Sequence, residues 1–245
     1  MKRKPSLVQR EDARFYEVAG RQLPSVTSVL KVFSKPGLVF WYAKMQRLSD
    51  AEIARKAKSP DEAAALIEQN TRPTEAHITK ATDIGAQAHA AIEWALRKKL
   101  GLPVGAKPVL KDAALKCYEA CRAWFRREGI TPLGTERVLY DLDLGVAGTM
   151  DFYGQDKQGR RFLLDWKTGN RVYPEAFLQN VAYRHMAARM KMPSEYGLIV
   201  RLPKEGGEPE VIRVPQEYTF EDFVTTLNCW RLWRRMEGKT EGGEV

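Results

Sequence analysis

The order of amphipathic patterns along this 245-residue chain predicts an α/β fold in which helices flank a mixed central β-sheet. Residues 81–100 and 110–128 carry apolar side chains at the spacing of one helix face. After them the period changes, and short segments rich in β-forming residues alternate with glycine-containing breaks. A change from helical to strand spacing within one chain indicates that the helices pack against a sheet.

Each element of this core is predicted from a local pattern. Three consecutive strands form a β-meander, a helix opened by Pro174-Glu175 follows, and Thr219 opens the last helix. The predicted strands are 135–140, 146–153, 161–166, 196–202 and 210–214, and the two later helices are 174–190 and 219 onward.

Residues 1–80 are predicted to form a mostly helical elaboration in front of the core, which takes residues 81–245. Turn residues and caps mark its parts. They are a hairpin around Ala19-Gly20, a short helix after Pro24-Ser25, a helix from about Leu38 and a helix that begins at Ser59-Pro60.

Composition excludes several classes of protein. Hydrophobic residues make up 44% of the chain, but no apolar run approaches the roughly 20 residues that span a bilayer. No apolar segment of a signal peptide follows the basic start, so we expect a cytoplasmic protein of a bacterial cell or a phage-infected host, without a membrane partner. Three cysteines do not make a disulfide framework, and we interpret Cys117 and Cys121 as small buried hydrophobic residues.

The charge balance suits a polyanionic partner. Lysine and arginine number 40 against 31 acidic residues, which gives a formal net charge of +9. The chain has no Walker A sequence, so we expect no nucleotide cofactor.

The strongest chemical signal comes from Asp151 together with Asp165 and Lys167, which follow the apolar run 162–164. Asp165 and Lys167 are two residues apart on a strand, so their side chains point to the same face. Asp151 lies on the preceding strand and can lie beside Asp165. Two neighbouring carboxylates repel each other unless a cation or a proton lies between them, and Mg²⁺ or Mn²⁺ fills that role. The alternative is a structural salt bridge between Lys167 and one or both carboxylates.

Five ordered motifs resemble the RecB-type branch of the PD-(D/E)XK nuclease superfamily. Asp151 followed by Asp165-Trp166-Lys167 resembles its bipartite acid–acid–lysine motif. The five motifs are Gly85–Glu93 (a G-x-x-x-H-x-x-x-E helix), Gly145–Asp151 (a glycine-led strand), Leu164–Gly169 (D-x-K-T-G), Gln179–Tyr183 (Q-x-x-x-Y) and Leu23–Leu30, which resembles an N-terminal element of phage-encoded members. The resemblance implies a restriction-endonuclease-like core without an iron–sulfur cluster, because the four cysteines of the cluster-bearing members are absent.

The resemblance also implies roles for individual residues. His89, Asp151, Asp165 and the backbone carbonyl of Trp166 would bind one or two Mg²⁺ or Mn²⁺ ions. Lys167 would orient the attacking water and stabilise developing charge, and it would act as a base only if burial lowered its pKa. Glu136 would be a catalytic residue together with Lys167, Asp165 and Asp151. Gln179, Tyr183 and Thr168 would bind the substrate.

Each of these roles has a structural alternative. His89 could be a packed histidine on an apolar helix face, and Glu136 could pair with Arg137. Gln179 and Tyr183 could belong to the core. Tryptophans interleaved with arginines between Trp230 and Arg235 could stack on single-stranded bases, but we interpret them as core and solvent-facing residues.

The sequence therefore predicts a metal-dependent DNA exonuclease that acts in phage or bacterial recombination, repair or DNA processing. DNA is the expected partner, and a recombination or single-strand-binding protein is a further one. The alternatives are a catalytically silent DNA-binding or assembly module of the same fold, and an RNA nuclease. The sequence predicts no oligomeric state.

Overall fold

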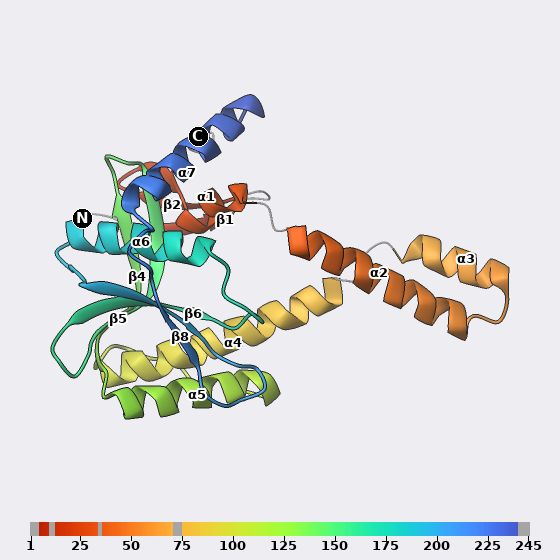
Figure 1. Cartoon of the computed structure of the whole chain (residues 1–245), viewed down its shortest axis with the longest axis horizontal. Helices are drawn as coiled ribbons and strands as arrows, with labels where there is room; N and C mark the ends of the chain where they lie inside the picture. Colours follow the sequence, from red (N-terminus) through yellow and green to blue (C-terminus); the bar gives the residue numbers. More distant parts are fainter. Residues whose placement is uncertain (1–4, 10–12, 34–35, 71–74, 240–245) are drawn as a thin grey trace. The chain divides into compact units, whose positions relative to one another are not determined.

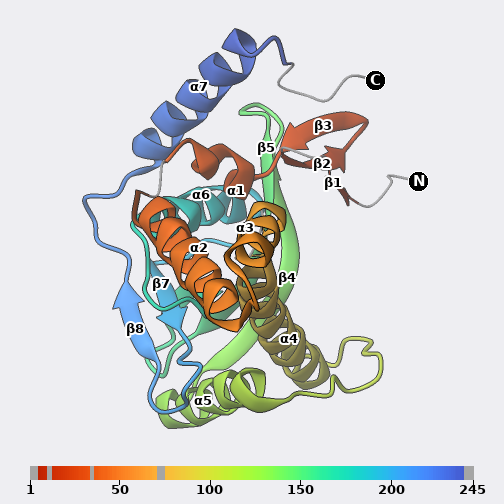
Figure 2. The same cartoon turned by 90° about the vertical axis from the view of Figure 1, so that its right-hand side faces the viewer.

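The structure contains a five-stranded mixed β-sheet with strand order β4-β5-β6-β7-β8 (Figures 1 and 2). The structure, a computed structural model, describes residues 5–9, 13–33, 36–70 and 75–239. Neighbouring strands are antiparallel except β6 and β7, which are parallel. The strands are β4 (Thr131–Asp141), β5 (Val146–Gln155), β6 (Arg161–Lys167), β7 (Tyr196–Arg201) and β8 (Glu210–Arg213).

Helices cover both faces of this sheet, so the predicted α/β class is confirmed (Figure 1). On one face the apolar stripes of α4 (Glu75–Lys99) and α5 (Asp112–Glu128) bury Phe152, Phe162 and Trp166. On the other face α6 (Glu175–Arg189) packs on Leu163, and α7 (Phe220–Met236) packs on α6. Burying strand residues on both sides explains why β6 reads as a continuous apolar run.

The N-terminal residues form a small antiparallel sheet of β1 (Ser6–Gln9), β2 (Arg14–Val18) and β3 (Arg21–Pro24). The helix α1 (Val26–Val29) and the 3₁₀ turn η1 (Leu30–Val32) follow it. Tyr16, Val18 and Leu23 pack with Ala147 of β5, and Ser25 forms an isolated bridge to Ala147. This N-terminal element therefore belongs to the same compact unit as the large sheet.

Contacts divide the chain into one unit of residues 1–33 and 87–245 and a second unit of Ser34–Ala86. The sequence prediction placed a single boundary at residue 80 instead. It grouped residues 1–33 with the helices that follow them, although their apolar side chains pack on β5.

The second unit contains α2 (Pro36–Lys56), α3 (Pro60–Gln69) and the first part of α4. Ser59 caps α3 by accepting a hydrogen bond from the Glu62 backbone nitrogen at 3.1 Å, as the sequence predicted. Asn70 ties α3 to α2, because its side-chain nitrogen donates to Ser49 Oγ and Asp50 Oδ1 at 2.9 Å. Among residues 40 and 42–70, whose exposure the structure describes, no side chain is buried.

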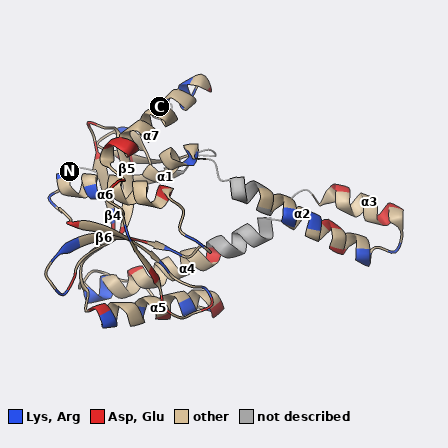
Figure 3. Cartoon of the chain, viewed as in Figure 1, with Lys and Arg blue, Asp and Glu red and all other residues tan. Residues whose placement is uncertain are grey.

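The sequence predicted every helix and strand of the first unit except β1 and the turn η1. Charges of both signs are interspersed along the described elements (Figure 3). In the described residues no helix combines the length and the apolar character that crossing a bilayer requires.

Candidate metal and catalytic site

Asp151 and Asp165 lie next to each other where β5 and β6 separate. The backbone pairing of these strands runs from Gln155–Arg161 to Phe152–Leu164, and the two aspartates are the next residues in that register. There the Asp151 side chain replaces a backbone acceptor, since its Oδ2 accepts a hydrogen bond from the Trp166 nitrogen at 2.8 Å. Because Asp165 is buried, the two carboxylates form an acidic pair with little access to water.

Three side chains from three different elements meet at this point and offer ligand atoms for a metal ion. His89 of α4, Glu136 of β4 and Asp151 of β5 each place one ligand atom within 4.8 Å of the others. His89 Nδ1 lies 3.7 Å from Asp151 Oδ2. The two carboxylate oxygens are ligands that Mn²⁺ and Mg²⁺ prefer, and the imidazole nitrogen adds a third donor, so the residues can hold the expected ion.

The backbone of Glu136 is unusual for a strand residue. Its φ is +45°, a left-handed conformation that side-chain-bearing residues rarely adopt. It lies between the paired residues Thr135–Phe152 and Arg137–Met150, which puts it across from Asp151. Strained conformations of this kind concentrate at functional sites because the surrounding structure must hold them.

The electrostatics of these residues reflect negative charges held together in a buried site. Burial, and then the neighbouring charges of Asp165 and Glu136, raise the pKa of Asp151 well above its usual range. Burial and the charges of Glu93 and Asp165 raise the pKa of Glu136 to about 7. Burial lowers the pKa of His89, which keeps its imidazole neutral and able to bind a metal. A divalent cation would stabilise all three in their ligating forms.

Lys167 forms an ion pair with Asp165, as the structural alternative predicted. Burial opposes the charge of Lys167, but the charges of Asp165 and Asp151 outweigh it and raise the pKa of the ammonium group. Lys167 is therefore a cation near neutral pH, and this favours orientation and charge stabilisation over a role as general base.

Gln179 holds Asp165 and Lys167 in place from helix α6. Its side-chain nitrogen donates to Asp165 Oδ1 at 2.9 Å, and its oxygen accepts from Lys167 Nζ at 3.0 Å. The same nitrogen lies 3.3 Å from the Tyr183 hydroxyl. Gln179 and Tyr183 thus border the acidic cluster while they are also buried in the core, so packing and site contact coexist.

Gly148 creates the space for Tyr183. A Cβ on Gly148 would lie 2.5 Å from Tyr183 Cε1, closer than carbon atoms approach each other. The glycine-led motif of the sequence therefore has a direct physical reason, because the tyrosine ring occupies the volume of a side chain on β5. Burial raises the pKa of the Tyr183 hydroxyl well above its usual range, so the hydroxyl remains protonated.

Two contributions near the site were not predicted from the sequence. Asn180 donates from its side-chain nitrogen to the carbonyl oxygens of Leu163 at 3.1 Å and Leu198 at 3.3 Å, which seats α6 on β6 and β7. A buried asparagine beside Gln179 in an apolar helix was the available signal. The Tyr16 hydroxyl lies 2.9 Å from Thr149 Oγ1, and no local pattern indicates this contact across 133 residues.

The predicted site residues thus fall into two adjoining groups. His89, Glu136 and Asp151 form the ligand cluster, and Asp165, Lys167 and Gln179 form a hydrogen-bonded group beside it. Glu136, predicted as a catalytic residue, lies in the ligand cluster. Asp165, predicted as a ligand, forms an ion pair with Lys167 and lies across from Asp151. The Trp166 backbone nitrogen donates a hydrogen bond to Asp151 Oδ2. Thr168 directly follows β6 and is half-buried. No hydrogen bond described in the structure joins it to the ligand cluster or to the group of Asp165, Lys167 and Gln179.

No family model and no curated protein matches the sequence. Among solved structures the chain is similar to the one described as the crystal structure of SSO0001, at 12% sequence identity and a TM-score of 0.34. The likeness covers 50% of this chain, and the chain spans about three fifths of that protein (60% of its length).

Proposed function

We propose that this protein is a metal-dependent deoxyribonuclease of the PD-(D/E)XK type, most simply an exonuclease, that hydrolyses phosphodiester bonds of DNA with Mg²⁺ or Mn²⁺. The convergence of His89, Glu136 and Asp151 beside the Asp165–Lys167 pair carries this proposal. The resemblance of the ordered motifs supports it, and the net charge of +9 suits a polyanionic substrate. The restriction-endonuclease-like core and a role in phage or bacterial recombination, repair or DNA processing are part of the same proposal.

The residues divide the chemistry between them. His89, Glu136 and Asp151 would hold the ion, which supplies charge stabilisation at the phosphate and a bound water of lowered pKa. Lys167, kept as a cation by Asp165, would stabilise negative charge on the scissile phosphate and orient the attacking water. Gln179 would fix the Lys167 ammonium group and the Asp165 carboxylate relative to each other.

The first experiment measures degradation of end-labelled linear DNA, single- and double-stranded, with Mn²⁺, Mg²⁺ or EDTA. Asp151→Asn and Lys167→Ala should each lower the rate by at least about a hundredfold, the usual scale for a lost catalytic group. The exposed residues Glu217 and Lys99 give matched controls, and Glu217→Gln and Lys99→Ala should cleave at the wild-type rate. Full activity in Lys167→Ala, or cleavage that persists in EDTA, would overturn the proposal.

Two further comparisons separate this proposal from its alternatives. Mn²⁺ should raise the melting temperature of the wild-type protein and not that of Asp151→Asn, because binding to the folded state stabilises it. Lack of cleavage and of this shift, with DNA binding retained, would favour the silent DNA-binding module. Supercoiled circular DNA should resist degradation, since an exonuclease needs an end, and equal rates on RNA would favour the RNA nuclease.

A further inference from the structure

One side of helix α2, in the second unit, groups apolar and basic side chains. Phe40, Lys44, Arg47 and Leu48 lie in α2 at the spacing of a single helix face. Because each residue turns the helix by about 100°, this spacing places all four within an arc of about 100°. Phe40 is 75% exposed, Leu48 is 50% exposed, and both cations are exposed. These four side chains, called the α2 face below, are open to a partner.

Helix α3 packs on a different side of α2. Gln46 Nε2 donates to the Asn70 backbone oxygen at 2.9 Å, and the Asn70 side chain donates to Ser49 and Asp50. In the helical register, these positions of α2 lie roughly opposite the α2 face. Within the second unit, the packing of α3 therefore leaves the α2 face uncovered.

The α2 face carries positive charge that no carboxylate of the described chain neutralises. Neither Lys44 nor Arg47 takes part in an ion pair, a side-chain hydrogen bond or a ring contact with a described residue. The two acidic residues of α2 lie outside the arc. Asp50 accepts hydrogen bonds on the side of α3, and Glu52 pairs with Lys56 at 2.6 Å. Adjacent unpaired cations of this kind complement a polyanion.

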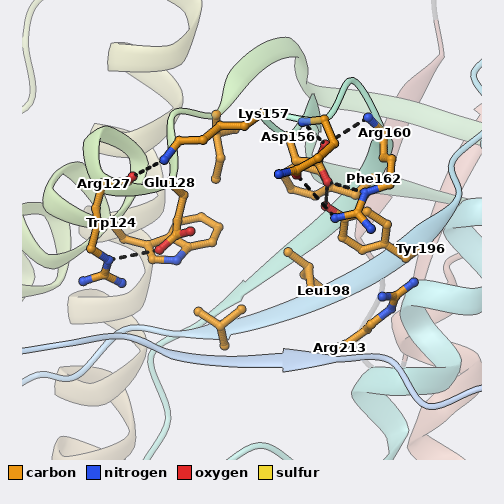
Figure 4. A pocket seen from close by; sticks show the side chains of 13 residues that line it. Trp124, Arg127, Glu128, Asp156, Lys157, Arg160, Phe162, Tyr196, Leu198 and Arg213 are labelled. Atoms are coloured by element: carbon orange, nitrogen blue, oxygen red, sulfur yellow. Dashed lines mark hydrogen bonds and ion pairs between the residues drawn. The ribbon is translucent and has the colours of Figure 1, made fainter.

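The cations around the largest described cavity of the first unit are arranged differently. This cavity of about 600 Å³ lies between the end of α5, the β5–β6 turn and the strands β7 and β8 (Figure 4). Arg127 and Arg160 form ion pairs with nearby carboxylates, and Lys157 and Arg213 lie at opposite ends of the cavity (Figure 4). The α2 face differs from this grouping because its cations are close in the helix and unpaired.

We infer that the α2 face binds single-stranded DNA, with backbone phosphates on Lys44 and Arg47 and a base stacked on Phe40. Proteins bind single strands with cations that follow the backbone and with exposed aromatic rings that stack on bases. Phe40 and Arg47 are about 10 Å apart along the helix axis, so a strand that runs along α2 meets the ring and both cations in succession. The choice of DNA over RNA rests on the proposed function.

The composition of the α2 face favours this occupant over three others. A duplex keeps its bases stacked inside and would leave the Phe40 ring without a partner. Helices that lie on membranes separate their apolar side from their cations, whereas Phe40 and Leu48 share one arc with Lys44 and Arg47. The core of an interface between two copies of the chain would be depleted in lysine.

The experiment measures fluorescence anisotropy of a labelled oligothymidylate with the full chain in EDTA, which withholds the ion that cleavage needs. The variant Lys44→Ala/Arg47→Ala should weaken binding at least tenfold at low salt. It should also reduce the slope of log affinity against log salt concentration by about 1.4, since each phosphate contact on a single strand contributes about 0.7. A merely structural role of these residues would leave the slope unchanged.

Phe40→Ala tests the stacked base. It should weaken binding of the single strand at least about fivefold and leave binding of a duplex unchanged. Lys56→Ala, on the same helix outside the α2 face, and Leu66→Ala, an exposed leucine of α3, are the matched controls and should bind as the wild type does. Because all of these side chains are exposed, each variant should keep the circular dichroism of the wild type.

Undiminished affinity or an unchanged salt slope in the double variant would overturn the inference. So would equal losses for single strand and duplex in Phe40→Ala. Two other results would also overturn it, each with DNA binding unaffected by the double variant. One is binding to phosphatidylserine vesicles that this variant loses, which indicates a membrane, and the other is a dimer that it disrupts, which indicates a second copy.

The outcome is distinguishable from that of the proposed function. The predicted binding without cleavage in any metal would overturn the nuclease activity and leave the single-strand contact in place. Metal-dependent cleavage, with binding that none of the α2 variants alters, would overturn the contact alone.

Discussion

Gly148 and Tyr183 show how a single side-chain volume shapes the site. Gly148→Ala places a Cβ where the Tyr183 ring now lies, so the ring or β5 must move. We expect the free energy of unfolding to fall by about 1–3 kcal/mol, the usual cost of overpacking a core, as measured by urea denaturation. Gly105→Ala, where a Cβ meets nothing within 4 Å, should leave stability within about 0.5 kcal/mol. Equal stability of the two variants would contradict the close contact.

Glu136 makes stability depend on pH in the absence of metal. Because burial and neighbouring carboxylates raise its folded-state pKa from 4.5 to about 7, the protonated form favours the folded state. The stabilisation is present below pH 4.5 and is lost as the pH rises through about 7.

At pH 8 the variant Glu136→Gln should therefore be more stable than the wild type, by about 1–3 kcal/mol. Denaturation in EDTA between pH 5 and pH 8 measures this, and the exposed variant Glu217→Gln should follow the wild-type curve. Parallel curves for Glu136→Gln and the wild type would show that Glu136 ionises normally.

At the scale of elements, the Asn180 side chain positions α6 on the sheet. Its side chain bridges the carbonyl oxygens of β6 and β7, and a Cβ on Gly197 would lie 1.8 Å from its Oδ1. Since Gln179 precedes it, the seating of Asn180 also places Gln179 on Asp165 and Lys167.

Asn180→Ala should lower the free energy of unfolding by about 2–3 kcal/mol, because it removes two buried hydrogen bonds and leaves a void. Denaturant unfolding measures this change. The exposed Asn228 of α7 offers the control, and Asn228→Ala should change stability by less than about 0.5 kcal/mol. A cost below that of the control variant would show that α6 needs no such anchor.

Local patterns predicted the elements and the acidic pair, but not the way that elements meet. The spacing of Asp165 and Lys167 and the short β5–β6 connection were enough to place Asp151 beside Asp165. The contact of Tyr16 with Thr149 depends on how the N-terminal sheet docks on β5, which no nearby residue encodes. The left-handed conformation of Glu136 likewise depends on tertiary packing, which no local pattern indicates. The strand β1, which was not predicted, is only four residues long.

At the scale of the whole molecule, one site draws on helices from both faces of the central sheet. His89 comes from α4, which packs on the face that buries Phe152, and Gln179 comes from α6, which packs on the face that buries Leu163. The described charges of both signs are interspersed (Figure 3), so recognition of a polyanion would depend on local groupings of cations.

We expect the second unit to differ from the first in the rate at which its backbone amide hydrogens exchange with solvent. The residues from 42 to 70 bury no side chain, and a helix without a buried face opens with little loss of free energy. In deuterated water, the amides of α3 should exchange within seconds to minutes, and those of β5 and β6 should persist until global unfolding. Mass spectrometry of peptic fragments measures both classes in one sample, and slow exchange in α3 would contradict this. A ligand of the α2–α3 helices would then reveal itself as protection that is absent from the free chain.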